Sequence, residues 1–209
     1  MKRVRVSVSP LFFLSAAALY FFDTDGSFLH VILASALHEL GHVLASSLLG
    51  GRVTELRLDA TGARMNVVLY GNNTLLRELF LSLSGPLLNF LSAFLAAKLG
   101  TRFSTPILYV FSGASLALGL FNLLPLSRLD GGQALRAIFF GFSGKKAFEA
   151  AFFTIELALS SALALFGLLI FLRSGYNFTL LSIGAWCFIC TISDIGNDGF
   201  YLFHPKIPL

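Results

Sequence analysis

Long apolar stretches alternate with short polar intervals along most of the chain, and this pattern predicts a polytopic membrane protein built from helices. The first stretch is short and follows a basic segment, as in a signal peptide, but no small-x-small cleavage site precedes Asp23. We therefore predict an uncleaved first span and a single domain over residues 1–209. The expected membrane-spanning helices lie at about residues 9–22, 27–49, 75–98, 104–126, 148–172 and 177–195.

The polar interval after the second span has a different period. Apolar and polar residues alternate from Glu55 to Asp59 and again from Ala63 to Val67, on either side of a glycine. This period of two predicts a β-hairpin at about residues 52–69. Lipid does not tolerate the unpaired edges of a hairpin, so we expect it at the membrane interface or against protein. The predicted fold class is an all-α polytopic membrane protein of about six transmembrane helices with a short membrane-associated β-hairpin.

Composition agrees with this class, since 56% of the residues are hydrophobic and only 12% are charged. With the N-terminus in the cytoplasm, every lysine and arginine except Lys98, Arg102 and Arg173 falls on the cytoplasmic side, in accord with the positive-inside rule. The compact architecture favours a bacterial cytoplasmic membrane. The 23 phenylalanines lie in apolar runs rather than beside a basic patch, so we expect no nucleic-acid partner.

Two histidines and a glutamate interrupt the second apolar stretch, in the sequence His38-Glu39-Leu-Gly-His42. Residues four apart share one face of a helix, so His38 and His42 can bind one metal ion. Glu39 then lies beside the ion, where a carboxylate can act as a base toward bound water. Ionisable groups at the centre of a membrane helix cost about 2.5–3.5 kcal/mol each and usually mark a functional site. This cost argues against a chance occurrence of the pattern.

A catalytic zinc site usually takes three protein ligands and leaves a fourth position for water. Three other candidates for the third ligand are less suitable. His30 lies too far along the helix, His204 lies in the C-terminal tail, and Glu156 has no partner motif. Asp130 follows a helix break at Pro125 and precedes two glycines, at a membrane depth similar to that of His42. Asp130 is therefore the best choice for the third ligand on physical grounds.

The two motifs together resemble the site-2 protease family of intramembrane zinc metalloproteases. The resemblance rests on His38-Glu39-Leu-Gly-His42 and on Asn122-x-x-Pro125-x-x-x-Leu129-Asp130-Gly131, and it covers most of residues 27–136. A further family element is similar to Ser84-Gly85-Pro86-Leu-Leu-Asn89, in the span between the motifs. Within the family, the chain looks most like the stage IV sporulation protease branch, without the C-terminal CBS domain that this branch often carries.

The resemblance implies one Zn²⁺ per chain and assigns a role to each motif residue. The implied ligands are His38, His42 and Asp130, and the implied general base is Glu39. Asn122 and Asn89 would be polar groups near the reacting carbonyl, although both can instead satisfy backbone groups freed by neighbouring prolines.

The reaction implied by the resemblance is hydrolysis of a peptide bond in a membrane-spanning or membrane-associated protein, as in the regulated release of a transcription or sigma factor. The hairpin at 52–69 would be similar to the family's substrate-guiding strand, which can pair with an unwound substrate by strand addition. The active site would then face the cytoplasm, and regulatory partners would be membrane proteins.

Two other functions are compatible with the same ligands. A metal-binding membrane transporter would need neither Glu39 nor a hairpin, and it should carry polar residues through the full membrane depth. The outer halves of the predicted spans show few such residues. A non-catalytic family member would bind membrane partners without cutting them, and the intact Glu39 argues against this alternative.

Overall fold

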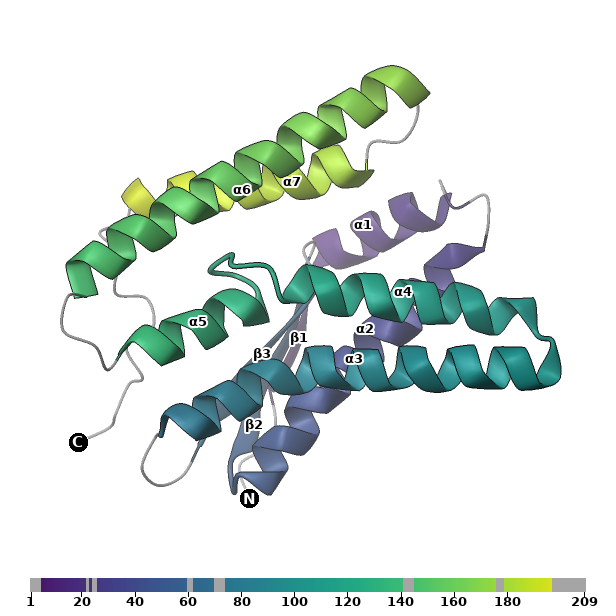
Figure 1. The fold of residues 1–209 in the computed structure, drawn as a ribbon, viewed down its shortest axis with the longest axis horizontal. Helices are drawn as coiled ribbons and strands as arrows, with labels where there is room; N and C mark the ends of the chain where they lie inside the picture. The colour runs from purple at the N-terminus through teal and green to yellow at the C-terminus, as the bar shows by residue number, and fades with distance from the viewer. Residues whose placement is uncertain are drawn as a thin grey trace. The chain divides into compact units, whose positions relative to one another are not determined.

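The structure is a computed structural model that describes residues 5–21, 23, 26–59, 62–69, 74–140, 145–175 and 179–196. These residues form helices and a small sheet, in the order β1, α1, α2, β2, β3, α3, α4, α5, α6, α7 (Figure 1). The chain divides into two compact units, one of Met1–Leu124 with Leu129–Ile138 and one of Pro125–Arg128 with Phe139–Leu209. The single domain expected from the sequence stays a prediction.

The first unit contains a three-stranded sheet of β1 (Arg5–Val8), β2 (Arg52–Asp59) and β3 (Gly62–Val68), in that order. The antiparallel pairing of β2 with β3 confirms the predicted hairpin, although the residues of its turn lie outside the described part of the chain. The sequence did not predict β1, which pairs in parallel with β2. Parallel strands need a long crossover connection, which α1 and α2 supply here.

Two long helices form the centre of the first unit, α2 (Ser27–Leu48) and α3 (Leu75–Phe103). Their 22 and 29 residues correspond to lengths of about 33 and 44 Å. The carboxylate of Asp23 accepts hydrogen bonds from the backbone N–H groups of Ser27, at 2.9 Å, and Phe28, at 3.0 Å. This carboxylate therefore satisfies two of the free donors at the start of α2.

Small and polar side chains fill the buried face of both helices. On α2 the buried residues are Ala34, His38, Gly41, Ala45 and Ser46. On α3 they are Ser82, Ser84, Gly85, Pro86, Asn89, Ala93, Ala96 and Gly100. A Cβ atom on Gly41 would lie 2.5 Å from the backbone oxygen of Ser84, so the backbones of α2 and α3 approach each other closely. This close approach lets the imidazoles of His38 and His42 pack against α3.

Helix α4 (Pro106–Asn122) runs back along α3 (Figure 1). It ends at Asn122, before Pro125, and the expected bounds of this span, about residues 104–126, stay a prediction. A new helix, α5 (Asp130–Phe140), begins between the fourth and fifth predicted spans. The chain turns tightly between them, since a Cβ atom on Gly131 would overlap the backbone carbonyl of Leu123. This turn places Asp130 at the first position of α5.

The second unit is a pair of packed helices, α6 (Lys145–Ser174) and α7 (Thr179–Gly196) (Figure 1). The segment Pro125–Arg128 belongs to the same unit. The backbone N–H of Ser127 donates to Oε1 of Glu156 at 2.9 Å, and the Ser127 hydroxyl donates to Oε2 at 2.6 Å. Glu156 is buried, and both oxygens of its carboxylate accept a hydrogen bond from Ser127, as a buried polar group requires.

Within the described part of the chain, three helices are long and apolar enough to cross a membrane, namely α2, α3 and the part of α6 from Phe148 to Ser174. Helix α4 and the Leu180–Ser193 part of α7 are apolar but shorter. Helix α1 (Pro10–Phe21) has 12 residues and a length of about 18 Å, less than the roughly 30 Å hydrocarbon core. The predicted fold class, a helical membrane protein with a small β element, is confirmed, whereas the number of six spans stays a prediction.

Candidate metal centre

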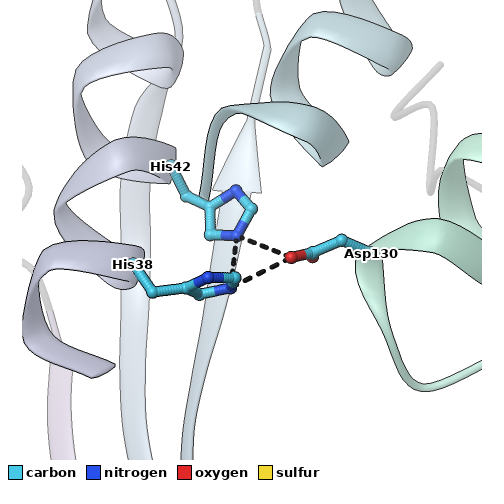
Figure 2. A group of neighbouring side chains, drawn as sticks. All are labelled: His38, His42 and Asp130. Carbon is cyan, nitrogen blue, oxygen red and sulfur yellow. Dashed lines mark hydrogen bonds and ion pairs between the residues drawn. The ribbon is translucent and has the colours of Figure 1, made fainter. Parts of the chain in front are cut away.

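The side chains of His38, His42 and Asp130 point toward one another (Figure 2). His38 Nε2 lies 3.2 Å from His42 Nε2, and Asp130 Oδ2 lies 3.0 Å from the first nitrogen and 3.3 Å from the second. The two imidazoles come from successive turns of α2, and the carboxylate comes from the start of α5. The structure thus brings together the three residues that the sequence predicted as metal ligands.

The hydrogen bond at the other ring nitrogen fixes the tautomer of His42. Its Nδ1 lies 2.9 Å from the backbone oxygen of Leu81 on α3. A carbonyl oxygen can only accept, so Nδ1 carries the proton and donates it. In the neutral ring, Nε2 then holds a lone pair directed at His38 and Asp130. This is the arrangement that ligating histidines adopt when a backbone carbonyl orients the ring.

The buried carboxylate completes a set of atoms that suits a metal ion. Asp130 Oδ2 is buried and accepts no hydrogen bond from the described residues, although both imidazoles lie within ion-pair distance. Burial raises the pKa of the Asp130 carboxyl, but the neighbouring His38 and His42 lower it by more, so its pKa lies below the usual value. A tetrahedron with bonds of about 2.0–2.1 Å has edges of about 3.3 Å, close to the three separations observed. The residues therefore fit a tetrahedral ion with one position left over.

Glu39 follows His38 on α2 and is half-buried beside the same cluster. Its carboxylate is close enough to His42, His38 and Asp130 to interact with all three electrostatically. The structure therefore places the predicted base next to the predicted ligands.

The two asparagines of the sequence analysis lie in different surroundings. Asn89 on α3 is fully buried, and its side-chain amide lies 3.3 Å from Nδ1 of His38. Asn122 is the last residue of α4, is half-buried, and donates from Nδ2 to the backbone oxygen of Leu118 at 3.0 Å. Asn89 therefore contacts a ligand ring directly, whereas Asn122 contacts its own helix.

Sequence reasoning missed how closely α3 supports the cluster. A Cβ atom on Gly85 would overlap His42 Nε2 and would lie 2.8 Å from His38 Nε2. The Ser84 hydroxyl lies 3.2 Å from His42 Nδ1 and donates to the Leu81 carbonyl at 2.7 Å. The available signal was the four-residue spacing of Leu81, Gly85 and Asn89, which places them on one face of a helix.

Known proteins resemble this chain in both sequence and fold. The model of peptidase family M50 matches residues 97–165, which include Asn122 and Asp130. A zinc metalloprotease of Methanocaldococcus jannaschii is 30% identical over 150 residues, which cover 68% of this chain and 42% of that protein. Residues 97–165 of the chain are thus similar to peptidase family M50.

Stage IV sporulation protein FB of Bacillus subtilis is also similar to this chain. It is 29% identical over 140 residues, which cover 65% of this chain and 48% of that protein. The chain thus spans less than half the length of these two curated relatives. The solved structure of a site-2 protease from Methanocaldococcus jannaschii matches with a TM-score of 0.66 and 23% identity, over 92% of each chain. This last match shows that the two share a fold.

Proposed function

We propose that this protein is an intramembrane zinc metalloprotease of peptidase family M50, which hydrolyses a peptide bond of a membrane-spanning or membrane-associated protein. The observation that carries the proposal is the convergence of His38 Nε2, His42 Nε2 and Asp130 Oδ2 within 3.3 Å of one another. Two of these atoms belong to a helix that is long and apolar enough to cross a membrane. The relative from Methanocaldococcus jannaschii is named a zinc metalloprotease, which supports the same function.

Zinc is the metal that this donor set suits best. Two imidazoles and one carboxylate occur at catalytic zinc sites, where the fourth position is left for water or substrate. The lone pair on His42 Nε2 and the buried Oδ2 of Asp130 already point to a common centre. Zinc bound at this centre would lower the pKa of a water toward about 7 and polarise a substrate carbonyl.

Glu39 is the proposed general base. Its position beside His38, together with its interaction with Asp130, places a carboxylate at the edge of the ligand cluster. The carboxylate accepts a proton from the attacking water and then donates it to the amine that leaves, so one side chain serves both steps.

Asn122 is the proposed donor toward the reacting carbonyl. It immediately precedes Leu123, whose backbone carbonyl contacts Gly131 beside the Asp130 ligand. One amide hydrogen of Asn122 is used within α4, and the second can stabilise negative charge on the carbonyl oxygen of a substrate.

The sheet is the proposed guide for the substrate. A helical peptide hides its carbonyls in backbone hydrogen bonds, so the cleaved segment must be extended before hydrolysis. An extended segment can pair with the outer edge of β3 (Gly62–Val68), the second strand of the predicted hairpin. We propose a role in regulated proteolysis, such as the release of a sigma factor under the control of membrane partners, and the likeness to the sporulation protein supports this role.

The proposed location is a bacterial cytoplasmic membrane, with the N-terminus and the active site toward the cytoplasm. The distribution of lysine and arginine supports this orientation, since Lys98, Arg102 and Arg173 alone would face outward.

A reconstituted cleavage assay tests the proposed function. The probe is a reporter with one membrane-spanning helix that contains a central Gly-Pro pair, placed in liposomes with the full chain. We expect the wild type to contain about one zinc per chain and to cut the reporter, and Glu39→Gln to keep the zinc but lose the activity by about 10²–10⁴-fold. Equal cleavage by Glu39→Gln would exclude the proposed base, and a folded wild type without zinc or cleavage would exclude the protease function.

A further inference from the structure

Asn89 carries an unsatisfied polar atom at the edge of the metal centre. The side chain has an exposed fraction of 0%, and Nδ2 lies 3.3 Å from His38 Nδ1. Its carbonyl oxygen Oδ1 is buried without a hydrogen-bond partner among the described residues. A buried acceptor without a donor costs about 1–3 kcal/mol. This cost calls for an arrangement in which the oxygen is used.

The amide orientation of Asn89 and the tautomer of His38 depend on each other. If Nδ2 donates to His38 Nδ1, the proton of the neutral ring lies on Nε2, which then has no lone pair for a metal. A half-turn of the amide exchanges oxygen and nitrogen at the same positions. Oδ1 then accepts from Nδ1–H, and Nε2 holds a lone pair directed at His42 and Asp130. In this second arrangement Oδ1 has a donor and Nε2 is free to bind the metal, while the amide hydrogens move to the former position of the oxygen.

His42 provides an internal precedent for this arrangement. Its Nδ1–H donates to the backbone oxygen of Leu81, which lies on the same helix as Asn89 and two turns earlier. Gly85 lies between them, against both rings. Three residues of α3 at intervals of four therefore contact the two imidazoles. The Leu81 carbonyl accepts from His42, Gly85 packs against both rings, and the Asn89 amide contacts His38.

We propose that Asn89 is a positioning residue for metal binding, whose Oδ1 accepts a hydrogen bond from Nδ1–H of His38. The bond holds the ring in the tautomer and orientation that direct Nε2 to the metal. The amide lies on the side of the ring opposite the ligand atom, so Asn89 acts through His38 rather than on the reacting carbonyl. The inference rests on the proposed function, because it requires a metal at this centre.

Metal affinity separates a positioning role from a catalytic one. The test measures the Kd for Co²⁺ of the detergent-solubilised full chain, from visible absorption in competition with a chelator. We expect Asn89→Leu, of similar size but without an acceptor, to weaken binding by about 10–100-fold. Asn89→Asp keeps the acceptor and should bind within about threefold of the wild type.

Ser115 supplies the matched control. It is also fully buried in the first unit, on α4, and its hydroxyl has no hydrogen-bond partner among the described residues. Ser115→Ala should leave the Kd unchanged. Wild-type affinity in Asn89→Leu, or equal losses in Asn89→Leu and Asn89→Asp, would overturn the proposal while leaving the metal centre intact. Absence of Co²⁺ and Zn²⁺ binding in the wild type would overturn the proposed function and this inference with it.

A second measurement does not depend on whether Asn89→Leu folds. The ¹⁵N spectrum of the zinc-loaded wild type, labelled at histidine and assigned with His38→Gln, reports which ring nitrogen of His38 carries hydrogen. The proposal expects a protonated Nδ1 and a metal-bound Nε2. A metal-bound or unprotonated Nδ1 would overturn it.

Discussion

Gly85 lies so close to the imidazole of His42 that a methyl group on its Cα would overlap Nε2. The backbone of α3 therefore forms one wall of the metal centre. We expect Gly85→Ala to displace the ligand nitrogens and to lower zinc affinity by about tenfold or more, because a metal site tolerates ligand shifts of only about 0.5 Å. The measurement is zinc content after dialysis against a weak chelator.

Gly113 on α4 is the control for the glycine substitution. A Cβ atom there would meet nothing within 4 Å, so Gly113→Ala should keep the zinc content of the wild type. Similar zinc contents in Gly85→Ala and the wild type would show that the close packing of α3 against the imidazoles is not needed for binding.

Removal of the metal should lower thermal stability. An ion that binds only the folded chain stabilises it by RT ln(1 + [L]/Kd), about 2.7 kcal/mol at a concentration of 100 Kd. For a chain of about 200 residues this corresponds to roughly 5–10 °C in apparent Tm, compared at one scan rate. A strong chelator should produce this decrease in the wild type but not in Asp130→Asn, which lacks a charged third ligand. An unchanged Tm in a wild type shown to lose zinc would contradict the prediction.

The carboxylate of Glu156 should stabilise the second unit through Ser127. Both of its oxygens accept from that residue, at 2.9 and 2.6 Å, in a buried setting. Glu156→Ala removes the acceptor of two buried hydrogen bonds, and we expect a loss of about 2–4 kcal/mol in the free energy of unfolding. Glu149→Ala, at a half-buried position of the same helix, is the control and should cost much less.

A double-mutant cycle with Ser127→Ala distinguishes this contact from general packing. If the hydroxyl contact contributes, the loss from Glu156→Ala should be smaller in the Ser127→Ala background. Equal losses in both backgrounds would mean that the hydroxyl contributes nothing.

Asn122 allows a test of catalysis against structure. If its second amide hydrogen stabilises the reacting carbonyl, Asn122→Ala should lower the cleavage rate by about 10²–10³-fold at unchanged zinc content. The bond from Nδ2 to Leu118 predicts only a small loss of stability, about 0.5–1.5 kcal/mol. A lower Tm with an unchanged rate would assign Asn122 a structural role alone.

The sequence allowed the metal ligands and the hairpin to be predicted because both depend on local spacing. The interval of four between His38 and His42 determines their common face on any helix, and alternation around a glycine determines the hairpin. Asp130 needed a further argument, from its depth at the end of a span. The structure brings these ligands to one place, as the sequence analysis expected.

Other features depend on contacts that no local pattern encodes. The start of α5 carries two glycines, which are weak helix formers, so its helical signal was missed. Strand β1 has only four residues and is held by its pairing with β2. The contact of Asn89 with His38 depends on how α3 is rotated against α2, which periodicity within either helix does not determine.

The parallel strand β1 makes the two edges of the sheet unequal. It presents four residues on one outer edge, whereas β3 presents seven on the other. The number of backbone hydrogen bonds that a guest strand can form increases with the length of the edge, and short edge strands are poor templates. For the proposed substrate strand, the β3 edge is therefore the better template, and this inequality comes from a strand far from the metal motif in the sequence.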